Sequence, residues 1–140
     1  MDDKLVNKIV EHEGIRKYAY TDTTGHITVG VGRNLSQGGE GLSTDEIVCL
    51  LKNDIARIQK DLSNYSWFKS LNDVRQGALV ELAFNVGVSG LLGFNRMIGC
   101  LDAKNYAGAA KELQNSTWAT QVSIARSKDM VERLSYGRYL

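Results

Sequence analysis

Glu13 is the first residue whose setting suits proton transfer. The segment before it is predicted to be helical, because its apolar residues recur at helical spacing and Gly14 follows it. These apolar residues are Leu5, Val6, Ile9 and Val10. At about 100° per residue, Glu13 falls in the middle of their arc. We expect burial and the negative end of the helix dipole to favour its protonated form, as a general acid requires. Pairing with a structural arginine is the alternative.

A second carboxyl, Asp22, opens a predicted turn that ends at Gly25. Residues 18–32 then show a period of two, with Ile27, Val29 and Val31 alternating with polar or small residues, so a β-hairpin is expected there. Thr28 falls on the polar face of its second strand. Each of these polar residues is ordinary by itself, because turns favour Asp and strands often carry Thr.

Together, the three polar residues match the groups that one reaction requires. Inverting glycoside hydrolysis needs one carboxyl to protonate the leaving oxygen and another to activate a water, with the two carboxyls about 6.5–9.5 Å apart. A nearby hydroxyl can hold that water. Glu13, Asp22 and Thr28 supply these groups in the order helix, turn and strand.

The elements that must position these residues follow from the spacing of glycine and of apolar residues. A glycine-rich loop leads into the capping box of Ser43 and Glu46, which begins a helix to about residue 62. After a connection at 63–71, Asp73 is expected to cap a helix that ends at Gly87, and further helices are expected at about 95–101, 106–113 and 123–136. This predicts one mostly helical α+β domain, with lobe 1 at about 1–42, a connecting helix at about 43–62 and lobe 2 at about 63–140. A cleft between the lobes is the expected place for a substrate.

Composition excludes several classes of protein. The 140 residues are 43% hydrophobic and 24% charged, with no apolar run long enough for stable membrane insertion, and the N-terminus lacks the pattern of a signal peptide. The net charge of +1, with no dense basic run, gives no reason to expect nucleic acid as a partner. Cys49 and Cys100 are expected as buried free thiols, and His12 and His26 as surface residues. No metal or other cofactor is expected.

Taken together, the motifs resemble those of the phage-type lysozymes (the T-even phage lysozyme and endolysin family, glycoside hydrolase family 24). Glu13, eight residues, Asp22, five residues and Thr28 reproduce the spacing of that family's catalytic triad. Its cleft-lining helix and loop resemble 83–87 and 93–94, and its C-terminal part resembles 116–118 followed by Arg126. Where the family usually has histidine, this chain has Arg33, so an ion pair there must use a permanently charged partner.

The resemblance implies a two-lobed lysozyme-like fold and N-acetylmuramidase activity. This is cleavage, with inversion, of the β-1,4 bond between N-acetylmuramic acid and N-acetylglucosamine in peptidoglycan. The resemblance also implies that Glu13 is the acid, and that Asp22 positions or deprotonates the water that Thr28 helps to hold. The substrate-binding residues that it implies are Phe84, Asn85 and Arg126, the last of which would pair with the catalytic glutamate.

The resemblance also implies a setting for the activity. A monomer is expected, made in a host cytoplasm and acting on the cell wall in the periplasm during host lysis, with release by a holin-type partner. Three other functions stay open from sequence: a lytic transglycosylase that forms 1,6-anhydro sugars, a non-catalytic peptidoglycan-binding module, and chitinase-like action. Asp22 and Thr28 argue against the transglycosylase, in which one glutamate works alone.

Overall fold

The computed structural model describes residues 3–140, so Met1 and Asp2 of the N-terminal sequence considered above lie outside it. The fold is mostly helical with one small antiparallel sheet, which confirms the predicted α+β class. The chain divides into two compact units, one ending at Leu50 and the other beginning at Leu51. The division into lobes proposed from sequence stays a prediction. Within residues 3–140, no helix combines the length and hydropathy that a membrane span requires.

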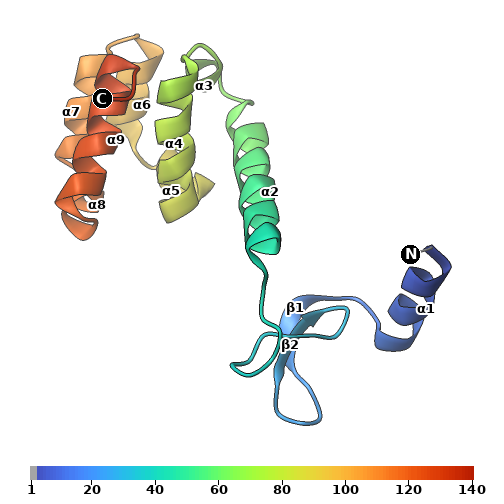
Figure 1. The fold of residues 1–140 in the computed structure, drawn as a ribbon. Coiled ribbons are helices and arrows are strands. Elements are labelled where there is room, and N and C mark those ends of the chain that lie inside the picture. The colour runs from blue at the N-terminus through green and yellow to red at the C-terminus, as the bar shows by residue number, and fades with distance from the viewer. Residues whose placement is uncertain (1–2) are drawn as a thin grey trace. The chain divides into compact units, whose positions relative to one another are not determined.

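The first unit begins with helix α1 (Asp3–Glu13), followed by strands β1 (Arg16–Thr21), β2 (Ile27–Gly30) and β3 (Arg33–Asn34) (Figure 1). Gly14 adopts φ +75° and donates its N–H to the Val10 carbonyl, so it ends α1 as its sequence position predicts. The strands pair antiparallel in the order β1-β2-β3. The sequence predicted the first two strands, and β3 was missed because two residues are too short for a period of two to show.

Two burial expectations for the first unit are wrong. No residue of α1 is buried, and Glu13 is exposed, because the described strands of this unit give the apolar face of α1 little cover. In β2 the predicted faces are reversed: Thr28 is 4% exposed and Ile27 is 51% exposed. Thr28 lies on the central strand opposite Tyr20 and Asn34, and directly opposed residues share a face, so their side chains flank it.

Helix α2 (Thr44–Leu62) starts with the predicted capping box. The Glu46 N–H donates to the Ser43 hydroxyl at 3.2 Å, and the Ser43 N–H donates to the Glu46 carboxylate at 3.1 Å. This satisfies two backbone donors that the first turn of a helix leaves without partners. The boundary between the two units falls inside this helix.

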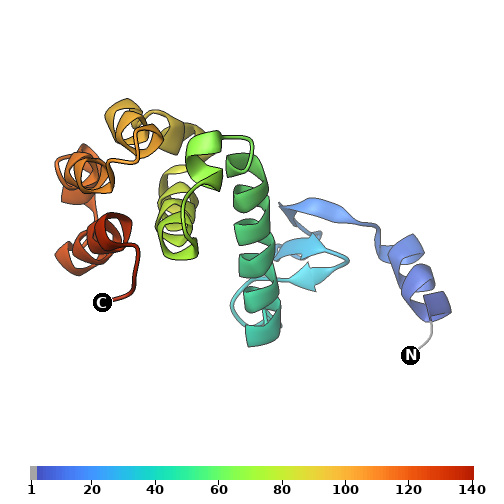
Figure 2. The same ribbon diagram turned by 90° about the horizontal axis from the view of Figure 1, so that it is seen from above.

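The second unit is helical throughout. Its remaining helices are α3 (Ser66–Lys69), α4 (Asp73–Val86), α5 (Val88–Leu92), α6 (Asn95–Asp102), α7 (Tyr106–Gln114), α8 (Thr117–Gln121) and α9 (Ile124–Tyr136). Helix α9 packs against α4 and α7, and α6 packs against α7 (Figures 1 and 2). The core is largely leucine, and Leu62, Leu79, Leu82, Leu101 and Leu134 are among its fully buried members.

The long helices of this unit agree with the sequence, whereas three short helices, α3, α5 and α8, were missed. Each has four or five residues, which is fewer than two turns and too few for an apolar stripe to repeat. The N-cap of α4 is Asn72 rather than Asp73: its side chain accepts the Arg75 N–H at 3.0 Å. Cys49 is exposed and Cys100 half-buried, so the expectation of two buried thiols is also wrong.

Candidate active site

Glu13 lies at the junction between α1 and the sheet. It is the last residue of the helix, and the turn between β2 and β3 approaches its carboxylate closely. A Cβ atom placed on Gly32, whose φ is +72°, would lie 3.3 Å from Glu13 Oε2. Both the positive φ and this approach favour glycine at position 32.

Asp22 lies directly after β1, in a turn that two backbone hydrogen bonds of Asp22 stabilise. The Asp22 N–H donates to the His26 carbonyl at 2.8 Å, and the Gly25 N–H donates to the Asp22 carbonyl at 3.1 Å. This is the four-residue turn that the sequence predicts, with Asp first and Gly fourth. It holds the aspartate at the tip of the hairpin, partly exposed.

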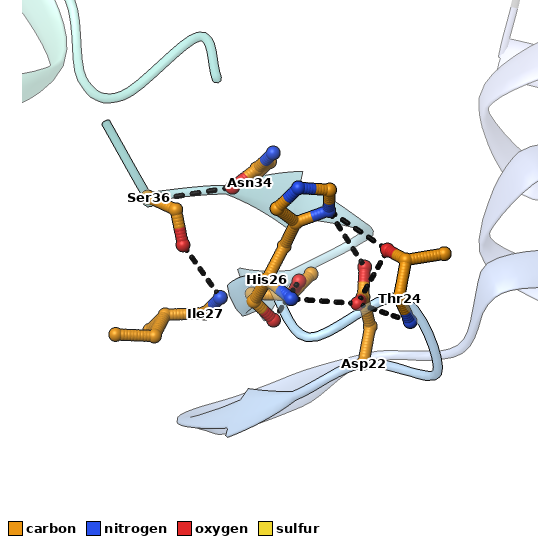
Figure 3. Close-up of polar contacts among 7 residues, drawn as sticks. Asp22, Thr24, His26, Ile27, Asn34 and Ser36 are labelled. Atoms are coloured by element: carbon orange, nitrogen blue, oxygen red, sulfur yellow. Dashed lines mark hydrogen bonds and ion pairs between the residues drawn. The ribbon is translucent and has the colours of Figure 1, made fainter. Parts of the chain in front are cut away.

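One carboxylate oxygen of Asp22 accepts three hydrogen bonds. Oδ1 accepts from the backbone N–H of Thr24 (2.9 Å), the Thr24 hydroxyl (2.8 Å) and the backbone N–H of His26 (2.9 Å) (Figure 3). The bond from the His26 N–H, followed by that from the Thr24 hydroxyl, lowers the pKa of Asp22 below its ordinary value. Asp22 is therefore a carboxylate at neutral pH. Its other oxygen, Oδ2, lies 3.8 Å from His26 Nδ1.

Thr24 and His26 belong to this cluster, and sequence reasoning did not assign them to it. The side chain of His26 is half exposed, so the predicted surface position is confirmed, yet its Nδ1 lies 2.8 Å from the Thr24 hydroxyl. The spacing i, i+2, i+4 from Asp22 in a tight turn was the signal that could have found both residues.

Thr28 is positioned by the same hairpin. Thr21 pairs with Ile27, and Tyr20 pairs with Thr28, so the register fixes Thr28 relative to the turn that starts at Asp22. Its hydroxyl donates to the His26 carbonyl at 3.2 Å, which leaves its oxygen lone pairs for a further donor. The hairpin therefore brings together two of the three residues predicted to act in catalysis.

The loop after β3 is fastened to the sheet. The Ser36 hydroxyl accepts the N–H of Ile27, and Asn34 Oδ1 accepts the N–H of Ser36 (Figure 3). The Leu35 N–H also donates to the Ile27 carbonyl. Arg33 Nη1 donates to the Gly41 carbonyl at 3.0 Å, which closes the other end of the loop. These bonds order a glycine-rich segment that has little side-chain packing of its own.

Arg33 also forms the ion pair expected from its departure from the family pattern. Its Nη1 lies 2.8 Å and 2.6 Å from the two carboxylate oxygens of Glu46. The hydrogen bond from Arg33, followed by that from the Ser43 N–H, lowers the pKa of Glu46 to about 2. The pair joins β3 to the first turn of α2.

Glu46→Gln is expected to lower Tm at pH 7. Because the folded pKa of Glu46 lies below the unfolded one, the stabilisation is present above about pH 4.5 and is lost as the pH falls toward 2. Thermal melts at pH 7 and pH 2.5 should show a difference in Tm between the wild type and Glu46→Gln that is smaller at pH 2.5. Glu40→Gln, which removes an exposed charge from the loop, is the matched control. An equal difference at both pH values would contradict the assignment.

In the second unit, the expected substrate residues have distinct surroundings. Phe84 is 50% exposed at the end of α4. The next residue, Asn85, accepts a hydrogen bond through Oδ1 from Trp118 Nε1 at 2.8 Å, and Trp118 is buried. Trp118 is therefore a core residue with a satisfied indole N–H. Asn85 has its amide N–H groups left for other partners.

Arg126, at the start of α9, lies 3.8 Å from Glu81 of α4. Glu81 also accepts a hydrogen bond from Arg133, whose side chain is 7% exposed. Two arginines of α9 thus face one glutamate of α4. The pairing of Arg126 with Glu13 expected from sequence stays a prediction.

Substituting Asn85 and Phe84 separately should distinguish a structural role from a substrate role. Asn85→Ala leaves the buried Trp118 N–H without an acceptor, at an expected cost of about 1–3 kcal/mol in the free energy of unfolding. Phe84→Ala removes a half-exposed ring, so we expect a smaller loss of stability and a higher KM for glycan strands. Urea melts and initial rates of both variants test this. An unchanged KM in Phe84→Ala would contradict the substrate role expected of Phe84.

Comparison with known proteins gives a consistent result. A family model described as phage lysozyme matches residues 10–133. The endolysin of Salmonella phage P22 is 31% identical over 111 residues, which cover 75% of each chain. "Probable T4-type lysozyme 1" of Dictyostelium discoideum is 25% identical over 78% of this chain and 81% of its own. The pre-baseplate central spike protein Gp5 of Enterobacteria phage T4 is 30% identical, and the match covers 83% of this chain and 25% of that protein.

Proposed function

The chain belongs to the phage lysozyme family, and from this premise we propose that it hydrolyses the glycan strands of bacterial peptidoglycan. The bond cleaved is the β-1,4 link between N-acetylmuramic acid and N-acetylglucosamine, with inversion at the anomeric carbon. The observation that carries the proposal is the state of Asp22. One of its oxygens is held by three hydrogen bonds, in a hairpin that also carries Thr28.

Glu13 is the proposed general acid. Its carboxyl gives a proton to the glycosidic oxygen while the bond from that oxygen to the anomeric carbon breaks, so the leaving sugar departs as an alcohol. Positive charge develops on the sugar ring in the transition state. The close approach of Gly32 supports this role because it restricts where the carboxyl can lie.

Asp22 and Thr28 are proposed to supply the water. Because Oδ1 of Asp22 is already committed, Oδ2 is the oxygen that can accept a hydrogen bond from a water on the opposite face of the sugar. The Thr28 hydroxyl oxygen can accept a second hydrogen bond from that water, which would orient the water further. The water oxygen bonds to the anomeric carbon as the bond from that carbon to the leaving oxygen breaks, and the proton of the attacking water passes to Asp22. Because the pKa of Asp22 is lowered, Asp22 is a weak base, so it first positions the water and stabilises the positive charge on the sugar, and takes the proton only as the new bond forms.

Three residues of the second unit are proposed for substrate binding. Phe84 offers an exposed ring to an apolar face of a sugar, and Asn85 offers its amide N–H groups while Oδ1 serves Trp118. Arg126 offers a permanent positive charge to carboxylates of the peptidoglycan. These three residues would bind the substrate and take no part in the chemical step.

Product analysis tests the proposed reaction. Purified peptidoglycan is digested in H₂¹⁸O, and the new ends are identified by mass spectrometry. Hydrolysis predicts reducing N-acetylmuramic acid that carries one ¹⁸O. Products that end in a 1,6-anhydro sugar, or reducing N-acetylglucosamine, would contradict it. The absence of any soluble product would favour a binding module.

We further propose that the chain acts on the cell wall as a monomer, in the periplasm of a bacterial host, with a holin-type partner that opens the inner membrane. Peptidoglycan lies outside that membrane, so an enzyme made in the cytoplasm needs such a route. Light scattering during size-exclusion chromatography tests the monomer, and co-expression with and without a holin tests the route through the timing of host lysis.

A further inference from the structure

The His26 ring contacts the Asp22 cluster, and the proposed mechanism gives it no role. Nδ1 lies 2.8 Å from the Thr24 hydroxyl and 3.8 Å from Asp22 Oδ2 (Figure 3). We infer that His26 is a positioning residue for Asp22: through the Thr24 hydroxyl it holds the carboxylate with Oδ2 open to the attacking water, and gain of charge on its ring weakens that water's activation. The inference rests on the proposed function of Asp22.

Counting hydrogens fixes the direction of the contact. The Thr24 hydroxyl has one proton and donates it to Asp22 Oδ1 at 2.8 Å. Its contact with His26 Nδ1 therefore needs a proton on Nδ1, donated to the hydroxyl oxygen. The result is a chain of two bonds, from the ring to the hydroxyl and from the hydroxyl to the carboxylate. This chain, with the two backbone N–H donors, keeps Oδ1 occupied.

Protonation of the ring changes the charge beside Oδ2. An imidazolium at this distance stabilises the carboxylate, so it adds to the lowering of the pKa of Asp22 that the His26 N–H and Thr24 bonds already produce. A carboxylate with lower proton affinity accepts a weaker hydrogen bond from water and activates it less. Because the His26 ring is half exposed, solvent screens its charge, and we expect protonation of the ring to lower the rate by about three- to fivefold.

The basic groups on the neighbouring strands have partners of their own. On β1, Arg16 and Lys17 each lie over a tyrosine ring of the same strand. On β3, Arg33 is bound to a glutamate of α2. Glu13 lies against the turn between β2 and β3. The Asp22 carboxylate is therefore the charged group that lies beside the His26 ring.

The pH dependence of two variants tests the inference. Initial rates on soluble peptidoglycan fragments are measured from pH 5 to pH 8, the interval in which histidine changes charge. In His26→Asn the amide can donate to Thr24 but cannot become charged. We expect the ratio of wild-type to variant rate to rise about three- to fivefold from pH 5 to pH 8. A pH effect that is common to both proteins cancels in this ratio. His12→Asn, on exposed α1, should give a flat ratio.

Substitutions of Thr24 test the link itself. ¹⁵N spectra of the neutral His26 ring at pH 9 should show the proton on Nδ1 in the wild type and in Thr24→Ser. Thr24→Val, which keeps the shape and removes the hydroxyl, should shift that proton toward Nε2 and reduce the pH dependence of the rate. A ring proton on Nε2 in the wild type would overturn the chain of bonds.

The outcomes separate this inference from the function on which it rests. An active wild type with a flat ratio for His26→Asn overturns the role of His26 and leaves the proposed hydrolysis intact. A wild type that releases no product at any pH overturns both. A ratio that rises with pH, with a rise that Thr24→Val reduces and Thr24→Ser retains, supports the inference in full.

Discussion

Glu13→Gln is expected to lower kcat on peptidoglycan by about 10²–10⁴-fold, because the amide cannot give the leaving oxygen its proton. The substitution keeps the shape of the side chain, so its contact with Gly32 can persist. Since Glu13 is exposed, we expect the free energy of unfolding to change by no more than about 0.5 kcal/mol. Rates from released reducing ends and urea melts measure the two effects.

Glu11→Gln is the matched control. Glu11 lies on the same helix two residues earlier, and its exposed carboxylate pairs with Lys8 at 3.0 Å. An exposed pair of this kind contributes little, so activity should stay at the wild-type level. If Glu13→Gln kept wild-type turnover while remaining folded, Glu13 would have no part in the mechanism.

Asp22→Asn is expected to lower kcat by about 10²-fold or more with a small change in KM, because it removes the negative charge that orients and activates the water. The asparagine oxygen can still accept the three hydrogen bonds that now reach Oδ1, so the turn should keep its geometry. Steady-state rates on soluble fragments give kcat and KM, and amide chemical shifts of residues 22–26 report the turn.

Asp45→Asn provides the comparison for Asp22→Asn. Asp45 is an exposed carboxylate in the first turn of α2, outside the proposed site. Its loss should leave kcat unchanged. A similar fall in kcat for both variants would show that the effect follows net charge rather than the position of Asp22.

Local signals in the sequence predicted the frame of the site well. Gly14, the Asp22 turn and the Ser43 capping box each depend on a few neighbouring residues, and each has the expected hydrogen bonds. The long helix α2 was also predictable, since an apolar stripe repeats several times along it. Short helices offered no such repetition.

Burial was the part that the sequence could not supply. Periodicity assigns Thr28 to one face of its strand but does not say which face of the sheet is buried. Strand β3, which flanks Thr28 on one side, has only two residues and gave no periodic signal. Glu13 likewise falls in an apolar arc, yet α1 is exposed along that arc. The role of His26 in the Asp22 cluster depends on a side-chain contact across the turn, which no periodicity encodes.

The stereochemistry of the first product tests the central claim most directly. If a water placed by Asp22 attacks the anomeric carbon while Glu13 protonates the leaving oxygen, the new reducing end is the α-anomer. Proton NMR of soluble peptidoglycan fragments, recorded within the first minutes after enzyme addition and before mutarotation, distinguishes the anomers. We predict that the α-anomer of N-acetylmuramic acid appears first. Initial release of the β-anomer would contradict the account, because it requires a covalent glycosyl-enzyme or another route to retention.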